Sequence, residues 1–246
     1  MNNATTIALS RLMAQERAMD VTAGNIANAN TPGYKAERVL FSEWLARQQN
    51  TQSPPGDSTI AYTQDRATWR EQRDGPLSHT GNPLDIAITG TGFFTVDTAR
   101  GPRLTRAGRF GLMPDGSIAN SAGEKLLDTQ GIPLQVSVTD TSISIAGDGT
   151  ISSENGRIGK IGVVAPADPM RLQAEGGTLL KADTPTQQVE QPRLVQGAVE
   201  DSNVQPILEV TRMINDSRQF EIVSQFVQAE ADRQQGAIDK ILQPRS

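Results

Sequence analysis

Few side chains in this sequence of 246 residues are of the types that carry out catalysis. The one histidine, His79, precedes a turn-forming stretch, where a lone histidine is more often structural or solvated than catalytic. Gly90-Thr91-Gly92 has the first two glycines of a dinucleotide-binding loop, but the third is missing, and Phe93 and Phe94 would block a phosphate. Neither a P-loop nor a nucleophile elbow is present in the sequence. We therefore predict that the protein is not an enzyme.

The sequence gives no support for a metal or cofactor site either. Asp115-Gly116 and Asp148-Gly149 place an acid before a glycine, which is typical of hairpin turns, and neither has the spacing of a calcium loop. The sequence contains no cysteine, which excludes disulfides and thiolate ligands. Clusters of histidine and carboxylate at ligand spacing are not visible either. We expect neither a metal nor a cofactor.

Composition excludes several kinds of partner. The net charge of −5 and the pI near 5.0 argue against binding to nucleic acid or to an anionic membrane surface. No run approaches the roughly 18 apolar residues of a membrane span. The N-terminus lacks the basic and apolar regions of a secretory signal, so we expect no cleaved signal peptide.

The element that must organise the chain is a long helix predicted from Asn203 to Leu242. Asn203 is a credible N-cap, Pro206 falls in the first turn, and Pro244 follows the end. Its length would be roughly 55–60 Å at 1.5 Å per residue. Apolar or small residues recur at steps of mostly three and four, as in a packing seam: Met213, Ser217, Phe220, Ser224, Val227, Ala231, Ile238 and Ile241.

A second amphipathic helix is predicted for residues 1–30, with Leu9, Leu12, Met19 and Ile26 among its apolar positions. It ends in an asparagine-rich turn that contains Asn25, Asn28, Asn30, Pro32, Gly33 and Tyr34. Each asparagine can adopt the left-handed conformation or bond the local backbone. This helix would be about 36–40 Å long, which leaves roughly 15–20 Å of the longer seam uncovered. We therefore expect both ends to be poorly ordered alone and to become helical when subunits stack.

Between the helices the pattern changes to short strands separated by turns. Leu84, Ile86 and Ile88 alternate with Asp85, Ala87 and Thr89, and both Asp-Gly pairs read as hairpin turns. The predicted fold class is α+β: a helical inner domain formed by both termini (1–35 and 200–246) and an inserted antiparallel β-rich domain, barrel or sandwich-like (77–199). Residues 36–76 would be a connecting segment, partly flexible around the Gln-rich stretch 48–56.

Two helical ends that seek the same surface on neighbouring subunits favour an assembly protein. Contacts that do not close into a ring propagate into a tube or filament. The rival interpretation from another class is a β-rich binding module or a secreted hydrolase that happens to have helical ends.

Several motifs resemble those of flagellar rod and hook proteins. The first is Asn25-Ile26-Ala27-Asn28-Ala29-Asn30-Thr31-Pro32-Gly33-Tyr34-Lys35, and another is Gly197-Ala198-Val199-Glu200-Asp201-Ser202-Asn203-Val204. Between them lie residues similar to the start of that family's β domain: Gly81, Asn82, Pro83, Leu84, Asp85, Gly90, Gly92, Phe93 and Phe94. These motifs fall in order along nearly the whole chain, and the mid-chain ones are most similar to a proximal-rod member.

The resemblance implies an axial component of the flagellar rod that transmits torque and contacts other rod proteins and copies of itself. It implies export through the flagellar type III apparatus into the periplasmic space, without a cleaved signal peptide. The seam residues and the asparagine turn would then be assembly positions. Within the family, a distal-rod protein or a hook protein is the alternative.

Overall fold

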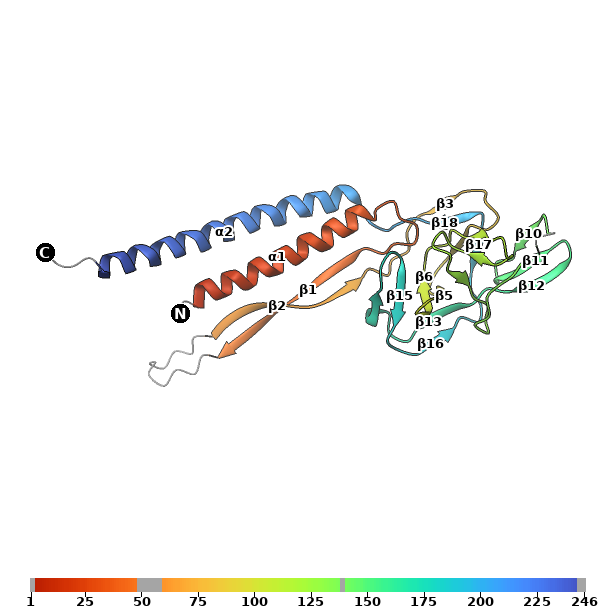
Figure 1. Cartoon of the computed structure of the whole chain (residues 1–246), viewed down its shortest axis with the longest axis horizontal. Coiled ribbons are helices and arrows are strands. Elements are labelled where there is room, and N and C mark those ends of the chain that lie inside the picture. Colours follow the sequence, from red (N-terminus) through yellow and green to blue (C-terminus); the bar gives the residue numbers. More distant parts are fainter. Residues whose placement is uncertain (1–2, 48–58, 138–139, 243–246) are drawn as a thin grey trace. The chain divides into compact units, whose positions relative to one another are not determined.

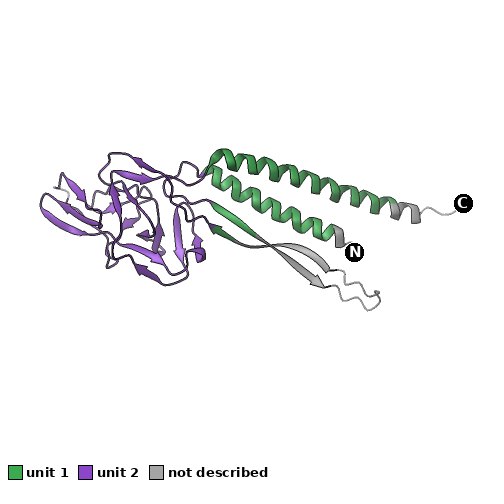
Figure 2. Ribbon diagram, turned by 180° about the vertical axis from the view of Figure 1, so that it is seen from behind, with its two compact units in different colours: residues 1–27, 37–69, 205–246 green, residues 28–36, 70–204 purple. Residues whose placement is uncertain are grey.

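The structure, a computed structural model, describes residues 3–47, 59–137 and 140–242, with side chains described for 5–40, 68–137 and 140–236. The chain divides into two compact units (Figure 2). Unit 1 comprises residues 1–27, 37–69 and 205–246, and unit 2 comprises residues 28–36 and 70–204. The described part of the chain has two helices and a central antiparallel β-rich region, so it is α+β as predicted.

Unit 1 contains both helices, α1 (Asn3–Ala27) and α2 (Pro206–Leu242), and a two-stranded sheet of β1 (Glu37–Arg47) and β2 (Thr59–Arg70). The helices lie side by side and run in opposite directions (Figure 1). Asn25 pairs with Glu209, and Gln15 pairs with Gln219. This register places Asn3 level with about residue 231, so about the last 16 Å of α2 continue past α1.

The start of α2 corrects the predicted cap. Pro206 is the first helical residue, where its missing N–H costs little, and the first helical bond runs from the Glu209 N–H to the Gln205 carbonyl. Asn203 lies before the helix in unit 2. Its side chain accepts the Ala36 N–H (2.7 Å) and donates to the carbonyls of Glu71 and Arg73. Asn203 is therefore not the N-cap of α2, because its amide bridges two other segments of the chain.

Residues 36–76, predicted as a connecting segment, contain β1 and β2. The Gln-rich stretch 48–56 lies outside the described residues. Within the predicted segment, Leu40 of β1 is exposed. The side chains of residues 41–67 lie outside the described set.

Unit 2 is built from short strands that pair with their neighbours. Its largest sheet follows the order β14-β15-β6-β5-β9-β8-β7, with β13 pairing β5 and β16 pairing β13. This sheet is an open path, so the closed-barrel form of the prediction is wrong. Smaller sheets join β10-β11-β12, β17-β4 and β18-β3.

The strands of unit 2 are β3 (Leu77–His79), β4 (Ile86–Ile88), β5 (Phe93–Thr98), β6 (Gly101–Thr105), β7 (Gly111–Leu112), β8 (Ile118–Ala119), β9 (Lys125–Leu126), β10 (Ile143–Ile145), β11 (Thr150–Ser153), β12 (Gly156–Lys160), β13 (Val163–Pro166), β14 (Leu172–Ala174), β15 (Leu179–Ala182), β16 (Thr186–Gln188), β17 (Leu194–Gln196) and β18 (Ala198–Glu200). A 3₁₀ turn, η1 (Pro169–Arg171), precedes β14.

Both Asp-Gly turns are confirmed. Asp115-Gly116 joins β7 to β8, and Asp148-Gly149 joins β10 to β11; each strand pair is antiparallel. Both glycines have φ near +80° to +90°, the left-handed region that an L side chain rarely adopts. The main core is an aliphatic cluster closed by Phe94 and Phe110, whose rings meet edge to face at 5.5 Å.

The closest backbone approach in this core generates a test. Gly108 accepts the Ile86 N–H (2.8 Å), and a Cβ at Gly108 would lie 1.7 Å from the Ile86 carbonyl oxygen. Gly108→Ala should therefore force β4 away and cost about 2–4 kcal/mol of unfolding free energy in a urea titration. Gly111→Ala, three residues on and in open space, should change it by less than about 0.5 kcal/mol. Equal stability of the two variants would contradict this packing.

Candidate functional site: two faces of the helix pair and a buried charge cluster

One face of α2 is partly buried, and it follows a seven-residue repeat. Among the described side chains of this helix, the buried or half-buried ones are Glu209, Asp216, Phe220, Val223, Val227 and Glu230. Their steps of seven, four, three, four and three residues are those of a coiled-coil seam. Glu209 meets Asn25, so this face is directed at α1.

The matching face of α1 is small and polar. Its buried residues are Ala8, Ala14, Gln15, Val21, Thr22 and Asn25. Small side chains let two helix backbones approach closely but bury little apolar area, while Gln15 and Asn25 bond across the pair. The seam therefore sets register more than it supplies stability.

A second apolar face of α2 is solvent-exposed. Ile207, Val210, Ile214 and Ile222, here called the outer stripe, are 82%, 44%, 48% and 68% exposed. At 100° per residue they lie on roughly the opposite side of the helix from the repeat that faces α1. Phe226 flanks the stripe and is 51% exposed. The sequence-based prediction did not include this face because it considered a single packing seam, although residues 207, 210 and 214 have helical spacing.

The predicted packing residues divide among these surfaces. Phe220 and Val227 are half-buried on the face directed at α1, and Met213 is exposed. On α1, Leu12, Met19 and Ile26 are half-buried, whereas Leu9 is exposed. The side chains of Ile238 and Ile241 lie outside the described residues. Their role in contacts with other subunits stays a prediction.

The three asparagines at the end of α1 have different environments. Asn25 is fully buried, and its amide accepts the Glu37 N–H (2.8 Å) and donates to the Glu37 carbonyl (2.9 Å). Asn28 is half-buried and its backbone carbonyl accepts the Thr31 N–H; Asn30 is exposed. None of them has positive φ, so the left-handed conformation is not used here, and Asn25 and Asn28 contribute hydrogen bonds instead.

The chain enters unit 2 at Asn28, and the residues that follow Asn30 pack tightly there. Pro32 is half-buried, and Gly33 has φ +73° and lies so close to unit 2 backbone that a Cβ would be 2.3 Å from the Ala107 nitrogen. Tyr34 is 5% exposed, with the Arg70 guanidinium 5.6 Å from its ring centre.

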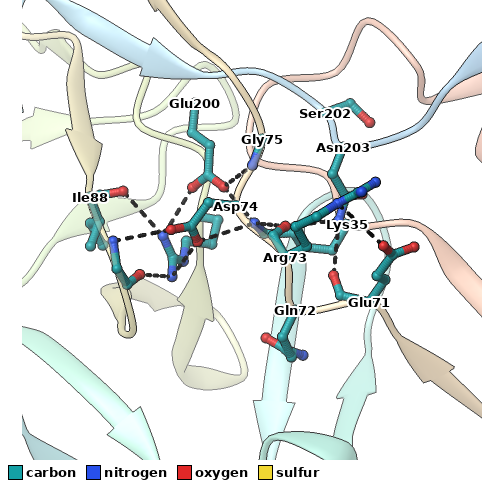
Figure 3. Close-up of polar contacts among 12 residues, drawn as sticks. Lys35, Glu71, Gln72, Arg73, Asp74, Gly75, Ile88, Glu200, Ser202 and Asn203 are labelled. Carbon is teal, nitrogen blue, oxygen red and sulfur yellow. Dashed lines mark hydrogen bonds and ion pairs between the residues drawn. The ribbon is translucent and has the colours of Figure 1, made fainter.

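A buried cluster of charges lies at this point in unit 2 (Figure 3). The Glu200 carboxylate accepts from the Lys35 ammonium (2.5 Å), from the Arg106 guanidinium (3.0 Å) and from the Gly75 N–H (2.9 Å). The three charged side chains are at most 4% exposed. Asp74 lies 3.9 Å from Lys35 and 3.7 Å from Arg106. The cluster joins residues separated by up to 165 positions, and nothing in the local pattern of either segment reveals it.

The predicted β-domain motif forms turns and core in unit 2. Asn82 accepts the Leu84 N–H and donates to Asp85, while Gly81, Asn82 and Pro83 themselves are exposed. Leu84 and Phe94 lie in the main core, and Phe93 lies in a second cluster on the other side of β5. Gly90 bonds Asp74 and Arg106, and a Cβ at Gly92 would lie 2.7 Å from Val163. These residues bond and pack against the chain itself.

The side chains considered first for chemistry are not gathered into a site. His79 is exposed at the end of β3. Within the described residues, no three histidine or carboxylate side chains are grouped as metal ligands would be. In that same part of the chain, neither helix has the length and apolarity needed to cross a membrane.

Comparison with known proteins identifies the class. Residues 6–35 match the family model described as flagella basal body rod protein, residues 87–153 the flagellar hook protein FlgE/F/G D1 domain, and residues 195–239 the flagellar basal body rod FlgEFG protein C-terminal. The chain belongs to the flagellar basal-body rod protein family.

Within that family the chain is similar to proteins named FlgF. It is 35% identical to the flagellar basal-body rod protein FlgF of Caulobacter vibrioides over 98% of both chains, and 33% identical to FlgF of Mesorhizobium japonicum over 97% of both. It is 29% identical to the rod protein FlgG of Agrobacterium fabrum, over 97% of this chain and 99% of that one. The resemblance inferred from the motifs is thereby confirmed, and the protein is FlgF-like.

Asn25 provides a test of how β1 is held against the end of α1. Asn25→Ala would leave the N–H and carbonyl of Glu37 without their buried partner, so we expect a loss of about 2–4 kcal/mol in the unfolding of unit 1, followed by circular dichroism. Asn30→Ala, at an exposed position of the same motif, should cost less than about 0.5 kcal/mol. Similar losses for the two variants would show that the bonds of Asn25 are not what holds β1 to α1.

Asp216 makes the stability of the helix pair depend on pH. Partial withdrawal from water raises the pKa of this carboxyl above its usual 3.8, and nearby Arg212 only partly offsets this. A carboxyl whose pKa is raised by folding destabilises the folded state when ionised, and the cost disappears as pH falls below the unfolded value. Asp216→Asn should therefore raise the melting temperature at pH 7 and leave it nearly unchanged below about pH 3.8. A gain that is the same at both pH values would contradict this assignment.

Proposed function

We propose that the chain is a non-enzymatic structural subunit of the proximal part of the flagellar rod, which transmits torque and packs against other rod proteins and further copies of itself. It reaches the periplasmic space through the flagellar export apparatus, without a cleaved signal peptide. Family membership supports the rod, and the greater identity to FlgF than to FlgG supports the proximal position. The family model matched by residues 87–153 names the hook protein together with FlgF and FlgG, but the relatives that match nearly the whole chain are rod proteins, so a hook protein is not favoured. A binding module and a hydrolase have no specific observation in their favour.

The outer stripe is the observation that supports assembly with neighbouring subunits. Four branched aliphatic side chains at 44–82% exposure on one face of a long helix are costly to leave in water. Full burial of an exposed side chain of this size contributes about 1.5–3 kcal/mol, so burying the part of each that is still exposed contributes roughly 0.7–2.5 kcal/mol. The face directed at α1 is already occupied. The part of α2 that continues past α1 adds more helix without an α1 partner. The same helix of a neighbouring subunit can cover both, and repetition of that contact builds a helical tube.

This proposal gives the predicted domains their roles. The terminal segments (1–35 and 200–246) form the inner helical part, residues 36–76 connect, and residues 77–199 form the outer β part. By their contacts, residues 28–36 and 200–204 belong with the β-rich unit. Leu9, Met213, Ile238 and Ile241 are further candidates for contacts with neighbours.

The test is to place a charge in the outer stripe. Ile222→Asp should abolish incorporation into basal bodies and spreading in soft agar, because a desolvated aspartate opposes burial by several kcal/mol. The melting temperature of the monomer should change by less than about 2 °C, since this side chain is 68% exposed. Ile222→Leu keeps the apolar surface and should assemble normally. Normal incorporation of Ile222→Asp would remove the stripe from the interface, and absence of the unaltered chain from purified basal bodies would overturn the proposed function.

A further inference from the structure

The chain passes between its two units four times, after Ala27, Ala36, Trp69 and Val204. Any load that travels along the chain from one unit to the other must pass through these covalent crossings. Each unit must therefore hold the segments that leave it, or the load would pull them out one at a time. A buried glutamate lies near the crossings in each unit, and each glutamate gathers the segments of its own unit.

In unit 2 this residue is Glu200, four positions before the last crossing. Its carboxylate binds Lys35, one position before the second crossing, and the N–H of Gly75, which follows the third. Its backbone carbonyl also accepts the Gly33 N–H (2.7 Å). Arg106 binds the same carboxylate, donates to the carbonyls of Ile88 and Gly90, and covers the Phe93 ring at 5.4 Å. One side chain thus ties three crossing segments to the sheet.

In unit 1 this residue is Glu209, five positions after the last crossing and 1% exposed. The Arg38 guanidinium, two positions after the second crossing, binds both of its oxygens at 2.8 and 3.0 Å. Asn25, before the first crossing, donates to it at 3.3 Å, and Arg212 binds it from the next turn of α2. Here again one carboxylate ties three segments: the end of α1, the start of β1 and the start of α2.

We infer that Glu200 and Glu209 are two mechanical latches, each of which clamps, inside its own unit, three of the segments through which the chain crosses between the units. The inference rests on the proposed torque-transmitting function. A buried ion pair adds little stability compared with a well-packed apolar cluster, but its directional bonds fix geometry, and removing one partner leaves a costly unpaired charge. The ion pair of Arg103 with Glu175, in contrast, joins β6 to the turn between β14 and β15 within unit 2 and ties no crossing.

The first test is hydrogen exchange on the full-length protein. Glu200→Gln should raise amide exchange at least about tenfold at residues 33–36 and 71–75 and leave residues 25–27 and 37–38 protected. Glu209→Gln should show the reverse pattern. The control, Glu175→Gln, removes a less buried carboxylate from an ion pair of unit 2 and should leave both sets unchanged. Exchange that is unchanged in both latch variants, or raised evenly along the whole chain, would overturn the two separate latches.

The second test applies load in cells that carry the variant in place of the unaltered chain. Latch variants should enter basal bodies and swim normally in dilute medium, but lose at least about half of their relative speed or shed flagella as viscosity rises. Arg38→Met, whose side chain is a quarter exposed, provides a milder break if Glu200→Gln fails to fold, and Arg38→Lys should recover part of the speed. Full speed under load for Arg38→Met, with exchange raised, would overturn a mechanical role. That result leaves the proposed function standing, because the chain would still be present in the rod.

Discussion

The structure of unit 2 depends on keeping the charge of Glu200 in a place that water does not reach. An unpaired carboxylate would cost several kcal/mol there, so the site requires Lys35, Arg106 and the Gly75 N–H together. Because Lys35 comes from the N-terminal segment, this requirement draws residues 33–36 into the β-rich unit, beside a strand that lies 165 residues later. Gly33 is needed for the same reason, since only a residue without Cβ fits against the backbone at Ala107.

Features whose cause is local could be predicted from the sequence. The Asp-Gly turns and the proline at the start of α2 each depend on a few neighbouring residues, and each is found as expected. A strand is also found at Ile86–Ile88, but Asp85 and Ala87 are buried as well, so the alternation does not separate a buried face from an exposed one. Asn203 fits the local pattern of an N-cap, yet its amide accepts the Ala36 N–H and donates to the carbonyls of Glu71 and Arg73, which belong to segments far away in the sequence. The ion pairs of Glu200 and Glu209 could not be predicted from the sequence for the same reason: a buried pair of opposite charges has no signature in either segment alone.

The helix pair was predicted in outline but not in the roles of its faces. A seven-residue repeat through Phe220 and Val227 is present, and it is directed at α1 of the same chain. The isoleucines that face away follow a second repeat, which a search for one seam passes over. A helix with two apolar faces has a place for a partner within the chain and another for a partner outside it.

The difference between these two faces explains how one helix can serve both purposes. The inner face carries Glu209, Asp216 and small partners on α1, so it is specific in register but contributes little apolar burial. The outer stripe carries Ile207, Ile214 and Ile222, which supply burial but no directional bonds. If the inner face were as apolar as the outer one, α1 and a neighbouring helix could exchange places at little cost. Polar groups on the inner face oppose that exchange, because Glu209 and Gln219 of α2 bond to Asn25 and Gln15 of α1, and a different helix would not supply these partners. In the proposed assembly, contacts through the outer stripe would therefore leave the arrangement inside each subunit intact.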